Sequence, residues 1–134
     1  MSPAAVAYFY GDDDLMIDRA VARFGAQVAA GGAPLERWDL RGSRNGAAAL
    51  IGELRGRIAT PTMFGGGTLA VVTSPGALTV RNEDRDALLA TIPLIADGNA
   101  LAIVEQTRSG AKGPGQAKLA EAVKAAGGRI EGLE

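Results

Sequence analysis

The sequence predicts an α/β domain of three layers, with a mostly parallel sheet of about five strands and helices on both faces. Short apolar runs, typical of strands buried on both faces of a parallel sheet, recur along the chain. Between them lie segments with apolar residues at helical spacing, most of which end at glycine or proline. Because strands and helices alternate, we expect right-handed crossovers and a single domain over residues 1–134.

The first strand is expected over residues 5–10, where the apolar run is continuous. Asp13 or Asp14 is a suitable cap for the following helix, which should end where Gly31 and Gly32 stop its apolar pattern. The next strand, residues 35–40, alternates apolar and polar side chains, which indicates one exposed face and a place towards the edge of the sheet.

The second helix should begin at Asn45 and end before the Thr60-Pro61 step, because a residue that precedes proline disfavours the helical conformation. The same patterns predict strands at 68–73, 99–105 and 129–131, helices at 84–92 and around 119–126, and a basic, glycine-rich loop at 109–114.

Composition excludes several functions. The chain has no cysteine and no histidine, so it has no disulfides, and neither zinc or iron–sulfur centres nor Ser-His or Cys-His catalysis is expected. Fourteen basic and 15 acidic residues give a net charge of −1, which offers no overall field to attract DNA. No apolar run approaches a membrane span, and the first residues lack the features of a signal peptide. We expect a soluble, cytoplasmic protein that does not associate with membranes.

No phosphate-binding loop is evident. The turn after the first strand, Gly11-Asp12-Asp13-Asp14, lacks the glycines, lysine and hydroxyl that a triphosphate needs, and its carboxylates would repel one. The loop from Gly110 to Lys118 has glycines and lysines but no Gly-Lys-Ser/Thr step. We therefore expect no nucleotide cofactor.

The three aspartates leave a second hypothesis open, a magnesium-dependent, phospho-accepting receiver-like domain that uses Asp12, Asp13 and Asp14. Such a pocket also needs a carboxylate at the end of the third strand, and none is there. Thr107 could supply its hydroxyl, but no lysine follows the last strand. Helix capping explains the aspartates more simply. We therefore expect no metal site and no catalytic residue.

The segment from Ile58 to Thr68 places Met63 and Phe64 between helix-stopping Pro61 and three glycines. An apolar pair on a loop either folds back into its own core or anchors a partner, because loops run over the surface and often carry function. Both readings are open from these residues alone.

In order, these pieces resemble the N-terminal domain of the delta subunit of bacterial DNA polymerase III, the subunit of the clamp loader that opens the sliding clamp. Three blocks that span nearly the whole chain carry the resemblance: Ala7–Ile17, Thr60–Gly65 with Leu69–Val72, and Ala100–Glu105 with Lys112, Lys118-Leu119 and Ala125–Gly128.

The resemblance implies a P-loop NTPase (AAA+)-like fold that lacks the phosphate loop and has no catalytic activity. It also implies that Met63 and Phe64, supported by Thr60, Pro61 and Thr62, bind the sliding clamp (the beta subunit) and help to open the ring for loading on DNA during replication. Gly66 and Gly67 depart from the polar or basic residues that the family often has there.

The family also has a lid-like domain and a helical collar that joins the other clamp-loader subunits. We expect this chain to be an excised N-terminal domain without them, which contacts DNA only indirectly. Direct contact of Arg108, Lys112 and Lys118 with DNA phosphates is a weaker alternative.

Overall fold

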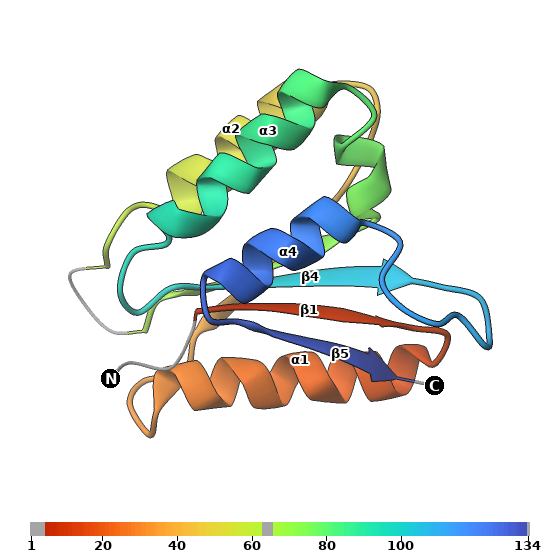
Figure 1. Ribbon diagram of the computed structural model, residues 1–134. Coiled ribbons are helices and arrows are strands. Elements are labelled where there is room, and N and C mark those ends of the chain that lie inside the picture. Colours follow the sequence, from red (N-terminus) through yellow and green to blue (C-terminus); the bar gives the residue numbers. More distant parts are fainter. Residues whose placement is uncertain (1–4, 63–65, 134) are drawn as a thin grey trace.

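The computed structural model describes residues 5–62 and 66–133 and confirms the predicted α/β class. Within these residues five parallel strands form one sheet in the order β2-β3-β4-β1-β5 (Figure 1). The strands are β1 (Val6–Gly11), β2 (Glu36–Arg41), β3 (Thr68–Thr73), β4 (Ala100–Gln106) and β5 (Arg129–Leu133). The helices are α1 (Asp14–Ala29), α2 (Ala47–Ile58), α3 (Asn82–Thr91) and α4 (Ala117–Ala125), with short 3-10 turns η1 (Pro75–Leu78) and η2 (Ile92–Leu94).

Helices cover both faces of the sheet, but unequally: α1 alone packs on one face, and α2, α3 and α4 pack on the other (Figure 1). Alternation along β1 separates the two apolar layers, because neighbouring side chains of a strand point to opposite faces. Tyr8 packs in the layer of the three helices, and Phe9 packs in the layer of α1. There Phe9 meets Phe24 edge to face, with 6.1 Å between ring centroids. The predicted three-layer arrangement is therefore present.

Helix α1 begins and ends close to the predicted positions. Asp13 caps it, since the Asp13 carboxylate accepts a hydrogen bond of 3.1 Å from the amide of Met16. The helix ends at Ala29, and Ala30 follows it in a left-handed conformation (φ 51°) directly before Gly31. Local sequence signals therefore define both ends of this helix.

Two other predictions concern the next two elements. The strand β2 lies at the edge of the sheet, as its alternating pattern indicated. The prediction that Asn45 begins the second helix is wrong, because α2 begins at Ala47. Gly46 precedes it in a left-handed conformation (φ 74°), without a side-chain cap. The later elements lie within two residues of their predicted ends, and η1 was not predicted.

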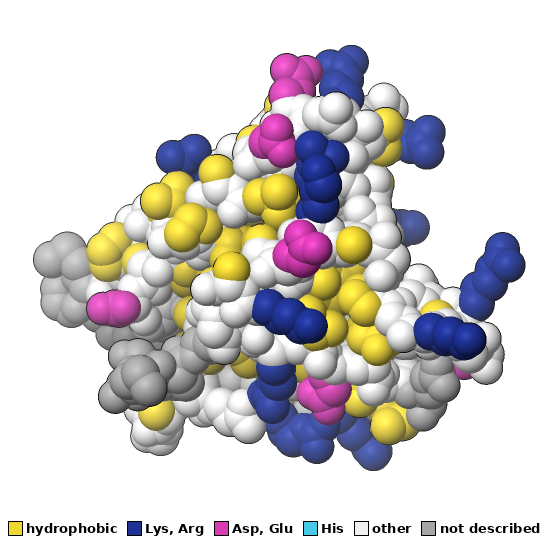
Figure 2. All heavy atoms as spheres, in the orientation of Figure 1, with side chains coloured by type: hydrophobic (Ala, Val, Ile, Leu, Met, Phe, Trp, Pro, Cys, Tyr) yellow, Lys and Arg dark blue, Asp and Glu magenta, His cyan; other side chains and the backbone are white. Residues whose placement is uncertain are grey.

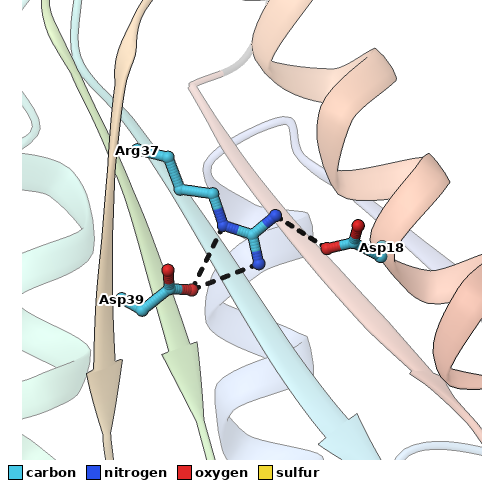
Figure 3. A network of polar contacts seen from close by, with 3 residues as sticks. All are labelled: Asp18, Arg37 and Asp39. Carbon is cyan, nitrogen blue, oxygen red and sulfur yellow. Dashed lines mark hydrogen bonds and ion pairs between the residues drawn. The ribbon is translucent and has the colours of Figure 1, made fainter.

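An exposed polar network connects α1 to β2 (Figure 3). The Arg37 guanidinium lies 2.7 Å from the Asp18 carboxylate and 3.2 Å from that of Asp39. Burial lowers the pKa of Arg37, but the hydrogen bonds to Asp18 and Asp39 outweigh this effect and the pKa is raised. Because the two carboxylate side chains are 60% exposed, this network stabilises the fold only weakly.

Candidate partner-binding loop

The loop of residues 59–67 connects α2 to β3 at the amino end of the sheet, on the left in Figure 1. Thr60, Pro61 and Thr62 are exposed, as a partner-binding segment requires. The predicted anchors Met63 and Phe64 lie outside the described residues. The structure therefore characterises the two ends of this loop.

The first end of the loop is fastened to the helix that precedes it. Ile58, the last residue of α2, is fully buried. The backbone N–H of Ala59 donates to the carbonyl oxygen of Arg55 at 3.0 Å, and the Thr60 hydroxyl donates to that of Gly56 at 2.7 Å. The chain leaves the helix from a fixed position.

Asn99, which directly precedes β4, joins the two ends of the loop. Its side-chain amide donates to the carbonyl oxygens of Ile58 (3.0 Å) and Thr60 (2.9 Å). Its side-chain oxygen accepts a hydrogen bond of 2.9 Å from the backbone N–H of Thr68. Asn99 is fully buried. It was predicted only as the first residue of a strand, and its one signal is a polar residue at the start of an apolar run.

Two glycines at the second end are required by close packing. A β-carbon on Gly66 would lie 2.1 Å from the carbonyl oxygen of Pro34. One on Gly67 would lie 2.1 Å from that of Gly98 and 2.6 Å from the side-chain oxygen of Asn99. Side chains at these two positions would collide with neighbouring backbone, so the packing at this end of the loop requires glycine at both.

Apolar residues lie beside the first end of the loop. The amide of Ala96 donates to the carbonyl oxygen of Ile58 at 2.9 Å, which brings the segment after η2 against the end of α2. Pro93 and Leu94 in η2 are exposed, and Leu89 is partly buried. Figure 2 shows hydrophobic side chains gathered over the end of α3 in this region. The loop thus emerges next to an apolar surface.

The carboxyl end of the sheet, on the right in Figure 1, has a different character. Only Asp12 and Asp13 connect β1 to α1, whereas a phosphate-binding loop spans about eight residues. Asp13 is engaged as the helix cap, and the Asp14 carboxylate accepts a hydrogen bond of 2.5 Å from the side-chain amide of Gln106. The turn is too short to enclose a triphosphate, and the Asp13 and Asp14 side chains already accept hydrogen bonds from other groups of the chain.

The usual ligand position of an open α/β sheet is closed by the chain itself. That position lies between neighbouring strands whose connections leave towards opposite faces, which here are β1 and β4. The amide of Thr107 donates to the carbonyl oxygen of Gly11 at 2.8 Å, and Gln106 reaches across to Asp14. These contacts tie the two strand ends together.

The strand order weighs against the receiver-like hypothesis. In domains with the receiver order 2-1-3-4-5, the first and third strands are neighbours. Here β4 lies between β1 and β3, so Asp12–Asp14 do not adjoin the end of the third strand. Over residues 5–62 and 66–133, no three His, Cys, Asp or Glu side chains gather in an arrangement that could hold a metal ion.

A cavity of about 620 Å³ opens beyond the ends of β3 and β4, and Arg41, Ser74 and Glu105 are among its lining residues. Glu105 accepts hydrogen bonds from the Tyr8 hydroxyl (2.8 Å) and from the amide of Gly115 (2.7 Å). Burial, and then the hydrogen bond to Glu105, raise the pKa of Tyr8 above its ordinary value. Through the second of these bonds, Glu105 holds the backbone at Gly115, directly after the basic loop of residues 109–114.

The basic residues Arg108, Lys112 and Lys118 are all exposed. Their contact with DNA phosphates stays a prediction, because exposed lysines and arginines are equally typical of a solvated loop.

Among the described helices, none is both long and apolar enough to cross a membrane. Neither a scan against protein-family models nor a search of curated proteins finds a match to this chain.

Proposed function

We propose that this domain is a non-catalytic binding module of the clamp-loader delta type, which docks on a sliding clamp through Met63 and Phe64. The observation that carries the proposal is that the buried side chain of Asn99 holds both ends of a loop whose residues Thr60, Pro61 and Thr62 are exposed. Between these ends the sequence places two large apolar residues, and Thr60, Pro61 and Thr62 flank them. A held loop with an apolar tip suits insertion into a pocket of a partner.

The carboxyl end of the sheet supports a role in binding without catalysis. The turn between β1 and α1 is too short for a phosphate loop, and the crevice beside it is closed by the Thr107 and Gln106 hydrogen bonds. We therefore propose a P-loop NTPase (AAA+)-like domain that has no nucleotide site and acts through contact with other proteins of DNA replication in the cytoplasm.

The chemistry of the two anchors suits this role. Methionine is unbranched and adapts to an irregular pocket, and phenylalanine supplies a large rigid surface. Burial of each side chain against a partner stabilises a complex by about 1.5–3 kcal/mol. The exposed Leu94 beside the loop is placed to extend the apolar contact.

Calorimetry with a purified sliding clamp from the same organism tests the proposal. We expect the Met63→Ala, Phe64→Ala double variant to bind at least about a hundredfold more weakly than the wild type, because two anchors are removed. Its thermal midpoint should not change, since residues that serve a partner contribute little to the core.

A matched control is the Leu15→Ala, Met16→Ala double variant, which removes another apolar pair, 59% and 39% exposed, at the opposite end of the sheet. It should bind like the wild type. Equal loss of binding in both double variants would point to nonspecific apolar attraction. A large loss of stability in the Met63/Phe64 variant would instead place that pair in the core.

A further inference from the structure

We propose that Asn99 is the positioning residue of the 59–67 loop: it fastens the two ends of the loop before any partner arrives. The structural part of this inference is carried by hydrogen bonds between described residues. Its consequence, tighter binding of the sliding clamp, rests on the proposed function.

The contacts of Asn99 join segments that are distant in the sequence. Ile58 and Thr60 precede Asn99 by 41 and 39 positions, and Thr68 precedes it by 31. One side chain therefore holds the end of α2, the first residues of the loop and the start of β3. The Asn99 backbone is itself held, because its amide donates to the carbonyl oxygen of Ala96 at 3.0 Å.

Only a primary amide of this length satisfies all three partners. Two carbonyl oxygens require donors, and one N–H requires an acceptor, which is the set of groups that asparagine carries. An aspartate would direct negative charge at the two carbonyl oxygens. A leucine would remove all three hydrogen bonds and leave the Ile58 carbonyl oxygen with the amide of Ala96 alone. The Oδ1 and Nδ2 positions follow from this pattern of partners.

Fixed ends reduce the number of conformations that the loop explores. A loop that is held in this way loses less conformational entropy on binding, and its affinity for a partner rises accordingly. Asn99 touches no partner in this scheme. It acts through Thr60 and Thr68, the residues that flank the apolar tip.

Hydrogen exchange of the free domain tests the structural part without a clamp. In Asn99→Ala, the amides of Thr68 and Ala96 should exchange at least about tenfold faster, because the Thr68 amide bonds to the Asn99 side-chain oxygen and the Ala96 amide bonds to the Ile58 carbonyl oxygen that Asn99 holds. The amide of Leu101, which bonds to Ala5 between β4 and β1, should keep its rate. Unchanged exchange at Thr68 and Ala96 would overturn the proposal.

Clamp binding tests the consequence. We compare the wild type, Asn99→Ala and a linear synthetic peptide of residues 56–68 by calorimetry, at a temperature where both proteins are folded. Asn99→Ala should bind about tenfold more weakly than the wild type and approach the peptide. The control Thr79→Val removes a side-chain hydrogen bond to Gln116 (2.8 Å) far from the loop and should bind like the wild type.

The outcomes separate the two proposals. If neither the wild type nor the peptide binds the clamp, the proposed function fails, and the exchange rates alone decide the role of Asn99. If the wild type binds and folded Asn99→Ala binds equally well, the positioning role is overturned. Should Asn99→Ala not fold, Asn99→Ser replaces it, because a hydroxyl can still donate to one of the two carbonyl oxygens.

Discussion

The connections at the two ends of the sheet differ in length and in exposure. At the carboxyl end, the connection from β1 to α1 has two residues, and side chains and backbone close the crevice between β1 and β4. At the amino end, the connection from α2 to β3 has nine residues, 59–67, and its described outer part, Thr60–Thr62, is exposed. Hydrogen bonds cross the usual ligand position between β1 and β4, and the opposite end of the sheet presents a loop that is held at both ends.

The amino end shows that a loop can be held at both ends by hydrogen bonds and close packing and still have exposed residues. Asn99 and the close approach of Gly66 and Gly67 to neighbouring backbone fix the ends of the loop, while Thr60, Pro61 and Thr62 remain exposed. At the carboxyl end the same kinds of hydrogen bond join the ends of β1 and β4. The position of the fixed groups within a connection therefore decides which of its residues stay exposed.

The largest expected effect disrupts the amino end. A methyl group on Gly67 would lie 2.1 Å from the Gly98 carbonyl oxygen, so Gly67→Ala should lower the free energy of unfolding by about 2–3 kcal/mol, measured by urea denaturation. The control Gly52→Ala places its methyl in open space on α2 and should raise the free energy of unfolding by about 0.5–1 kcal/mol. If Gly67→Ala proves as stable as the wild type, Gly67 does not pack tightly against the Gly98 carbonyl oxygen.

A smaller effect tests the carboxyl end. Asp13→Ala removes the cap of α1 and should lower the free energy of unfolding by about 1 kcal/mol, measured by thermal denaturation. Asp12→Ala alters an exposed neighbour outside this cap and should change stability little. Magnesium should not shift the melting temperature of any of these proteins. A magnesium-dependent rise in the wild type that is absent in Asp13→Ala would favour the receiver-like hypothesis.

The smallest effect concerns the exposed ion pairs between α1 and the edge strand β2, which belong to neither end of the sheet. Arg37→Gln removes the ion pairs with Asp18 and Asp39, and the free energy of unfolding should fall by less than about 1 kcal/mol because these groups are exposed. The loss should shrink in 1 M salt, which screens such pairs. Arg23→Gln, on an exposed position of α1, is the control. A loss that persists at high salt would indicate packing by the arginine stem instead of charge attraction.

Much of the fold could be predicted from local patterns. The bounds of β3 are those expected from its apolar run, and Asp13 caps α1 as the acidic turn indicated. The start of α2 was misplaced because Asn45 is a good cap by type, whereas the chain uses Gly46 in a left-handed conformation. Capping by backbone geometry leaves no side-chain signal in the sequence.

The sequence indicates the candidate loop, and Met63 and Phe64 as its binding residues stay a prediction. The sequence marks Met63 and Phe64 by their setting between Pro61 and three glycines, and Thr60–Thr62 beside them are exposed. The hydrogen bonds of Asn99 to both ends of the loop were not predicted, because its three partners lie between 31 and 41 positions away. Such contacts arise only when β3 and β4 become neighbours.

The sequence by itself determined the alternation of strands and helices, the cap of α1, the edge position of β2 and the lack of a phosphate loop, because periodicity and turn chemistry act over a few residues. The tertiary structure alone decided the strand order, the closure between Gly11 and Thr107, and the fastening of the 59–67 loop by Asn99. These features depend on backbones that meet across the sheet. Their geometry is set by the packing of distant segments and not by the residues beside them in the chain.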